Sequence, residues 1–325
     1  MPSSCANLTV ESRRWPQAGL SRASPRLGLR GRGKGLFVLN GVILLWYLLT
    51  VPSVIFVAID IWRSTPEAKV LKWAFIILTL FTGPIGAFFY VLGCREPLAG
   101  THEQYVATRW RQVLGSTMHC AAGDGIGIIV GAAIGAALTL AFWPDFLLEY
   151  ALGFGFGWAF FQAFAMRDMA GGSYSKSLRM TFLPELLSMN LLMAGMQLVS
   201  RFVMPHVTDG NDPTNIRFWF IMSMALLVGF IFAYPMNWWL VSNNMKHGML
   251  TVRAAAKRPA ANSTAAMPMG APASMPQEQD AMADMDMSSH SDVAEPSTGR
   301  KAAMTVLSFV ILGAALLLVV LFAQM

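Results

Sequence analysis

The stretch STMHCAAGDGIGIIVGAAIGAALTLAF, residues 116–142, combines the apolar length of a membrane helix with three polar side chains. A helix that crosses a bilayer needs about 20 mainly apolar residues. His119, Cys120 and Asp124 lie near one end of this one, where an ionised carboxylate costs roughly 3 kcal/mol or more. Small residues that let a neighbouring helix approach recur at every fourth position: Gly123, Gly127, Gly131 and Gly135. We therefore expect Asp124 to be buried between helices, either paired or protonated.

The composition of the whole chain is that of a membrane protein. Of its 325 residues, 55% are hydrophobic and 13% are charged, and the mean hydropathy is +0.49. Soluble proteins carry about 25% charged residues, so we predict an all-α, polytopic membrane helical bundle in contact with the lipid bilayer. No basic platform with interleaved aromatic residues indicates nucleic-acid binding. Seven apolar runs predict transmembrane helices: Leu36–Ile61, Leu71–Gly93, Ser116–Phe142, Phe146–Met166, Pro184–Val203, Phe218–Val241 and Ala303–Phe322.

Charge predicts the orientation and the division of the chain. With the N-terminus inside, 19 of the 24 Lys and Arg residues fall in the inner segments and 5 in the outer ones, which favours an N-in, C-out arrangement of the membrane helices. Residues 1–35 form a basic tail and 36–250 a six-helix body. Residues 251–302 have the composition of a disordered Met-, Ala- and Pro-rich linker, and 303–325 contain a detached C-terminal helix.

Further polar side chains are predicted to lie at the depth of Asp124, on the cytoplasmic side of the membrane. The direction of each helix places them there, and they come from the fourth, fifth and sixth predicted helices and the residues just beyond: Gln162, Glu185, Asn190, Asn237 and His247. Convergence of polar groups from several helices on one level is the most informative pattern in this sequence, because intramembrane ionisable residues mark functional sites.

Methionine is abundant, with 22 residues, and suggests a soft metal ion. Met189, Met193 and Met196 share a helix face with Glu185, and thioether, thiolate and imidazole groups all bind Cu(I). The segment MADMDMSSHSD, residues 282–292, resembles the Met/His-rich tracts of copper-handling proteins and offers a second set of ligands: Met282, Met285, Met287 and His290. Methionine is also a flexible packing residue, so a hydrophobic core and a low-complexity tether remain the alternatives.

Three spaced motifs carry a resemblance to a known family. They are HCAAGDGIG (119–127), FQAFAMRDMAGGSYSKSLRMTFLPELLSMNLLMAGM (161–196) and YPMNWWLVSNNMKHGM (234–249). In this order they resemble the bacterial integral membrane family called domain of unknown function 4396, over about residues 110–250. The resemblance implies a membrane fold without an established activity, and some members carry copper-related names. Related sequences often have a second cysteine after the His-Cys pair, where this chain reads Ala-Ala-Gly-Asp, which weakens a site with two thiolates.

Two classes of function stay open. The first is a membrane protein that binds or transports a soft metal ion such as copper through a cluster of His119, Cys120, Asp124, Glu185 and the three methionines. The second is a structural or assembly protein, whose polar cluster and glycines serve helix packing alone. An enzyme is the least favoured class. His119 and Asp124 could exchange protons, but no nucleophile has an obvious base.

Overall fold

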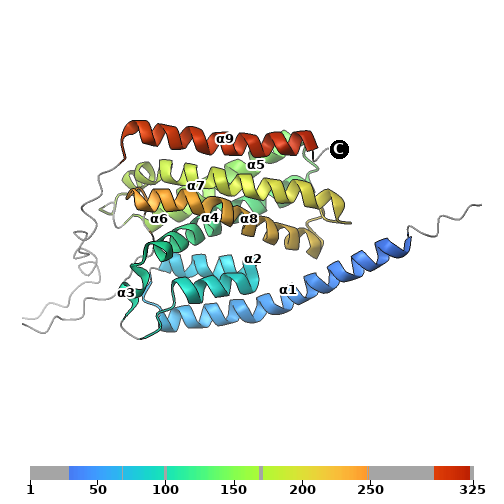
Figure 1. Ribbon diagram of the computed structural model, residues 1–325, viewed down its shortest axis with the longest axis horizontal. Helices are drawn as coiled ribbons and strands as arrows, with labels where there is room; N and C mark the ends of the chain where they lie inside the picture. The colour runs from blue at the N-terminus through green and yellow to red at the C-terminus, as the bar shows by residue number, and fades with distance from the viewer. Residues whose placement is uncertain are drawn as a thin grey trace, which may run out of the picture. The chain divides into compact units, whose positions relative to one another are not determined.

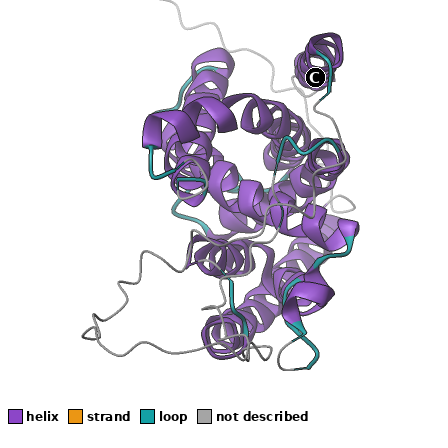
Figure 2. Ribbon diagram, turned by 90° about the vertical axis from the view of Figure 1, so that its left-hand side faces the viewer, coloured by secondary structure: helices purple, strands orange, loops and turns teal. Residues whose placement is uncertain are grey.

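The computed structural model describes residues 29–67, 69–98, 101–167, 171–246, 248 and 296–322. It divides into two units, residues 1–42 and 43–325, and all contacts discussed below lie in the second. Every regular element described is a helix (Figure 2). The elements are α1 (Leu29–Ser64), α2 (Lys69–Gly93), α3 (His102–Val106), α4 (Arg109–Ala137), α5 (Phe142–Phe154), the π-helix η1 (Gly155–Gln162), α6 (Ala163–Ala165), α7 (Tyr174–Val203), the 3₁₀-helix η2 (Met204–His206), α8 (Ile216–Ser242) and α9 (Thr298–Phe322).

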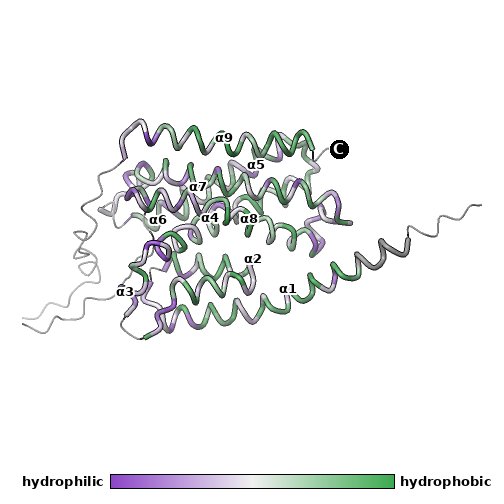
Figure 3. The backbone as a smooth tube through the Cα atoms, in the orientation of Figure 1, coloured by the Kyte–Doolittle hydropathy of each residue, from purple (hydrophilic) through white to green (hydrophobic). Residues whose placement is uncertain are grey.

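Six of the described helices are long and apolar enough to cross a membrane, which supports a multi-pass membrane protein. They cover Phe37–Ser64, Lys69–Gly93, Arg109–Ala137, Tyr174–His206, Ile216–Ser242 and Thr298–Phe322. Hydrophobic residues run along most of each helix, while hydrophilic residues gather near α3 and the helix ends (Figure 3). The apolar faces of α1 and α9 are largely exposed, as lipid contact requires.

The prediction of seven spans is not confirmed. The fourth predicted span, Phe146–Met166, is a succession of α5, η1 and α6. These elements follow one another without a break from Phe142 to Ala165, but α5 alone, with 13 residues, is shorter than the about 20 residues of a regular membrane helix. The third predicted span is also shifted, because α4 begins at Arg109 and ends at Ala137, where a turn through Thr139 leads into α5.

Helix α2 is kinked near its middle. In α2, Gly83 has a φ of +57° immediately before Pro84, and the helix kinks there. A side chain is disfavoured at this φ, and an added Cβ would lie 2.6 Å from Thr50 Oγ1 of α1. The kink therefore depends on glycine both for its backbone conformation and for the close approach of α1.

The candidate site is positioned by α4, α5 with η1, α7 and α8, which pack on one another (Figure 1). The sequence predicts a C-terminal helix that is detached from the body. This helix is separated from the other helices along the chain, but α9 lies along α7 (Figure 1). There Asn190 Nδ2 donates a 3.1 Å hydrogen bond to Ser308 Oγ of α9. A buried polar pair of this kind fixes the contact between two otherwise apolar helices.

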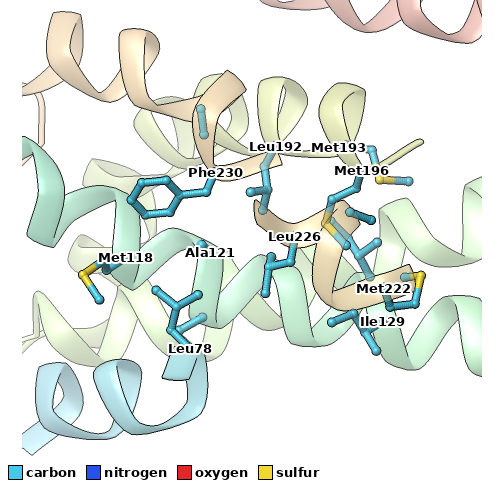
Figure 4. Close-up of a cluster of buried hydrophobic side chains, with 14 of the residues drawn as sticks. Leu78, Met118, Ala121, Ile129, Leu192, Met193, Met196, Met222, Leu226 and Phe230 are labelled. Atoms are coloured by element: carbon cyan, nitrogen blue, oxygen red, sulfur yellow. The ribbon is translucent and has the colours of Figure 1, made fainter. Parts of the chain in front are cut away.

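The hydrophobic core lies among α2, α4, α7 and α8. Figure 4 shows Leu78 of α2, Ala121 and Ile129 of α4 and Leu192 of α7 close to Leu226 of α8. Met193 and Met196 belong to the same cluster, and Met189 is also fully buried in it. All three methionines predicted as metal ligands are thus part of the hydrophobic packing.

Candidate metal centre

The glycines of α4 bring that helix into close contact with α5 and η1, in an antiparallel register. An added Cβ at Gly127 would lie 2.3 Å from the Leu152 carbonyl oxygen, so no side chain fits there. The facing positions advance by one helical turn at a time along both helices: Gly123 with Gly157, Gly127 with Gly153, Gly131 with Glu149, and Gly135 with Asp145. This register places the acidic groups of α4 and α5 at opposite ends of a shared interface.

At one end of this interface, α4 and α7 bring three potential metal ligands together. Cys120 Sγ and one carboxylate oxygen each from Asp124 and Glu185 all lie within 4.8 Å of one another. All three residues are fully buried. Cys120 and Asp124 are one turn apart on α4, which gives them a common face, and the Cys120 thiol donates to Glu185 Oε2 at 3.3 Å.

Several oxygen atoms in this group have no hydrogen-bond donor in the part of the chain that the structure describes. They are both carboxylate oxygens of Asp124 and Oε1 of Glu185. One oxygen of each of the two carboxyl groups lies within 4.8 Å of the other. Asp124 fits against η1 only because residue 157 is glycine, since an added Cβ there would lie 1.6 Å from Asp124 Oδ1. Unpartnered buried carboxylate oxygens are unusual in folded proteins and call for an explanation, such as an ion.

A lysine that sequence reasoning missed completes the group. Lys246 follows the end of α8, and its Nζ donates to Glu185 Oε2 at 2.8 Å and to Cys120 Sγ. Its side chain is 1% exposed and that of Glu185 is fully buried. Burial alone would lower the pKa of Lys246, but the adjacent Cys120 and Glu185 outweigh it and raise the pKa above its usual range. The 2.8 Å ion pair with Glu185 makes Lys246 a buried ammonium group beside two of the three potential ligands.

His119 lies beside this group and not in it. Its ring makes an edge-to-face contact with Phe161, at 5.4 Å between ring centroids, and interacts with the Gln162 side chain. The ring Nε2 has no partner among the described residues. The structure thus brings together Cys120, Asp124 and Glu185 from the predicted ligand set and places His119 next to them.

The other predicted polar residues pair in different ways. Asn237 of α8 donates to Ser188 Oγ at 2.9 Å, one turn beyond Glu185 along α7. Asn190 accepts from Tyr150 at 2.7 Å and so links α5, α7 and α9. His247 lies outside the described residues, as do the four predicted ligands of the linker: Met282, Met285, Met287 and His290. Asn237 and Asn190 therefore form hydrogen-bonded pairs of their own, outside the cluster of Cys120, Asp124 and Glu185.

With this geometry established, comparison with known proteins identifies the segment that carries it. Residues 109–246 match the family described as domain of unknown function (DUF4396). This confirms the resemblance seen in the sequence motifs. No curated protein and no solved structure matches the chain. The DUF4396 segment begins with the first residue of α4 and ends at Lys246, so it includes every side chain of the candidate centre.

The DUF4396 segment holds a second buried charged cluster, which the sequence reasoning also missed. Arg201 of α7 binds Asp145 Oδ2 at 2.6 Å and Glu149 Oε1 at 3.0 Å. Gln197 donates to the other oxygen of Glu149 at 2.5 Å. Since both carboxylates are paired with arginine, this cluster has the features of a structural ion-pair network.

Proposed function

We propose that this protein is a multi-pass membrane protein that binds a transition-metal cation between α4 and α7. The observation that carries the proposal is the convergence of one thiol and two carboxyl groups, all fully buried, within 4.8 Å. Buried charges in proteins are paired or coordinate metals. The donor-free oxygens of Asp124 and Glu185 supply the free lone pairs that a cation requires.

The ligand chemistry favours a borderline divalent ion such as Zn²⁺. Zinc is held by cysteine sulfur, histidine nitrogen and carboxylate oxygen, and three protein ligands leave one coordination position open. Cu(I), the ion suggested by the methionines, prefers sulfur donors. Met189, Met193 and Met196 pack in the hydrophobic core, where Figure 4 shows Met193 and Met196, so their placement favours packing. Binding of Cu(I) instead of Zn²⁺ by this centre is the alternative, and metal stoichiometry distinguishes the two ions.

A purely structural role is the second candidate, and the Lys246 contacts favour it. An ammonium group that bonds Glu185 and Cys120 satisfies part of the cluster without any metal. It also ties the chain after α8 to α4 and α7. In this reading the centre locks helix packing, and the loss of any member strands a buried partner at about 1–3 kcal/mol.

Metal stoichiometry of the full-length chain in detergent separates these two functions. After chelation and removal of free chelator, we expect one equivalent of Zn²⁺ to bind with high affinity. Cys120→Ser, Asp124→Asn and Glu185→Gln should each reduce this binding, because each removes a ligand. The matched control is Cys94→Ser, a second fully buried cysteine, which should bind zinc like the unaltered protein.

Binding by the Met/His-rich segment is measured separately. Replacing Met282, Met285, Met287 and His290 by alanine in the full chain should leave the single zinc equivalent intact and should remove only additional Cu(I) sites. Absence of zinc binding by the unaltered chain, together with lower thermal stability in all three site variants, would establish the structural role and overturn the metal centre.

A further inference from the structure

The position of Lys246 raises a question that the proposed metal site must answer. Its Nζ bonds the Cys120 sulfur and one oxygen of Glu185, which are two of the three donor atoms of that site. A metal ion would require lone pairs on the same atoms. The ammonium group and a bound metal therefore compete for the same donors.

We propose that Lys246 is a tethered cation that holds the centre closed and is displaced from Cys120 and Glu185 when a metal ion binds. This inference rests on the proposed function. It adds a residue that sets the affinity and the selectivity of the site. Lys246 is a positioning residue for the two ligands, and is not itself a ligand.

Electrostatics makes joint occupancy unfavourable. The Lys246 and Glu185 side chains are 1% and 0% exposed, so the surroundings are of low dielectric and charges interact more strongly there than in water. A divalent ion at the donor atoms of Cys120 and Glu185 would face a positive charge that now lies 2.8 Å from Glu185 Oε2. Departure of the ammonium group relieves this repulsion and frees both donors for the metal.

The local structure around Lys246 allows such a movement. The residue lies beyond the last residue of α8, Ser242, in a short non-helical segment. Its long, flexible side chain has four carbons, so Nζ can leave the cluster while the backbone stays in place. The backbone is held nearby, because Gly248 packs so closely on α4 that an added Cβ would lie 2.5 Å from the Gln112 carbonyl oxygen.

Competition with Lys246 also predicts which cations enter. Mg²⁺ and Ca²⁺ favour oxygen ligands and gain little from a cysteine sulfur. An ion that binds thiolate strongly gains more binding free energy from Cys120. This gain offsets the loss of the lysine contacts. We therefore expect Lys246 to exclude oxygen-seeking ions more strongly than Zn²⁺.

The first test compares metal affinity with and without the lysine. Zn²⁺ titration of the full chain carrying Lys246→Met should give at least tenfold tighter binding than the unaltered chain, and Mg²⁺ binding should become detectable. The matched control is Lys176→Met, at an exposed lysine in the first turn of α7, which should leave the affinity unchanged. Equal zinc affinity with and without Lys246 would contradict the proposed competition, but it would not contradict the metal centre. If neither chain binds zinc, both proposals fail.

The second test needs no variant and so does not depend on how Lys246→Met folds. Acetylation of the unaltered protein by an amine-reactive ester, read by mass spectrometry, should spare Lys246 in the metal-free form. Saturation with Zn²⁺ should increase its modification several-fold, while Lys176 reacts equally in both states. If Lys246 stays protected when zinc is bound, the displacement is wrong.

Discussion

At the scale of single residues, an added Cβ would have the least space where an acid of one helix faces a glycine of the next. Asp124 lies against Gly157, and Asp145 lies in the same way against Gly135. The absence of a side chain at these two positions gives the carboxyl groups their space. The glycines are therefore requirements of the polar clusters as much as of helix packing.

A matched pair of glycines in η1 tests this requirement. Gly157→Ala places a Cβ 1.6 Å from Asp124 Oδ1, whereas a Cβ at Gly155 has no atom within 4 Å apart from its own surroundings in the chain. We expect Gly157→Ala to lower the free energy of unfolding by about 1–3 kcal/mol, as overpacking does. Gly155→Ala should be neutral or slightly stabilising, because alanine favours helix. Thermal unfolding in detergent measures both, and equal stability of the two variants would contradict the contact.

At the scale of helices, the second charged cluster joins α5 to α7. Arg201 holds Asp145 and Glu149, which are one turn apart on α5, and Gln197 supports Glu149 from the same face of α7. Removal of one member of a buried ion pair is costly, because the partner charge stays buried without compensation.

Arg201→Ala should therefore destabilise the protein by about 3–5 kcal/mol, the range observed for broken buried pairs. The control is Arg95→Ala, because Arg95 is 44% exposed and its partner Asp60 keeps a hydrogen bond from Tyr90. Loss of an exposed pair should cost about 0–1 kcal/mol. Chemical denaturation or thermal scans of both variants provide the comparison, and a loss at Arg201 no larger than that at Arg95 would show that the cluster contributes little.

At the scale of the whole molecule, orientation in the membrane is the main prediction. The excess of Lys and Arg favours residues 1–35, 94–115, 167–183 and 251–302 on the cytoplasmic side and Met325 outside. The starts of α4 and α7 and the end of α8, with Lys246, would then face the cytoplasm. Metal would reach the centre from that side.

Reporter fusions at each of these segments measure the orientation. We expect cytoplasmic reporter activity from fusions within 94–115, 167–183 and 251–302, and periplasmic activity from a fusion after Met325. A periplasmic signal from 251–302 would reverse the assignment. It would also place the Met/His-rich tract outside the cytoplasm, together with the Lys246 end of the centre.

The sequence by itself determined the class of the protein and most of its helices. Runs of about 20 apolar residues predict membrane helices because an unpaired backbone is too costly in lipid, and the described part of the chain contains six such helices. It also predicted the family resemblance over about residues 110–250, and residues 109–246 match that family. The spacing of Cys120 and Asp124 on one helix face is a local property that needs no knowledge of the neighbouring helices.

Only the tertiary structure decided which polar groups meet. Lys246 lies beyond the predicted end of its helix at Val241, so the sequence indicated only an inner-side charge, while its side chain in fact enters the core. Asp145 fell in a predicted outer loop, yet the turn at Thr139 begins α5 early and buries it beside Arg201. Helical periodicity determines the face on which a residue lies. The partner of that face depends on the register between helices, which is determined by close contacts such as Gly127 with Gly153 that join distant parts of the chain.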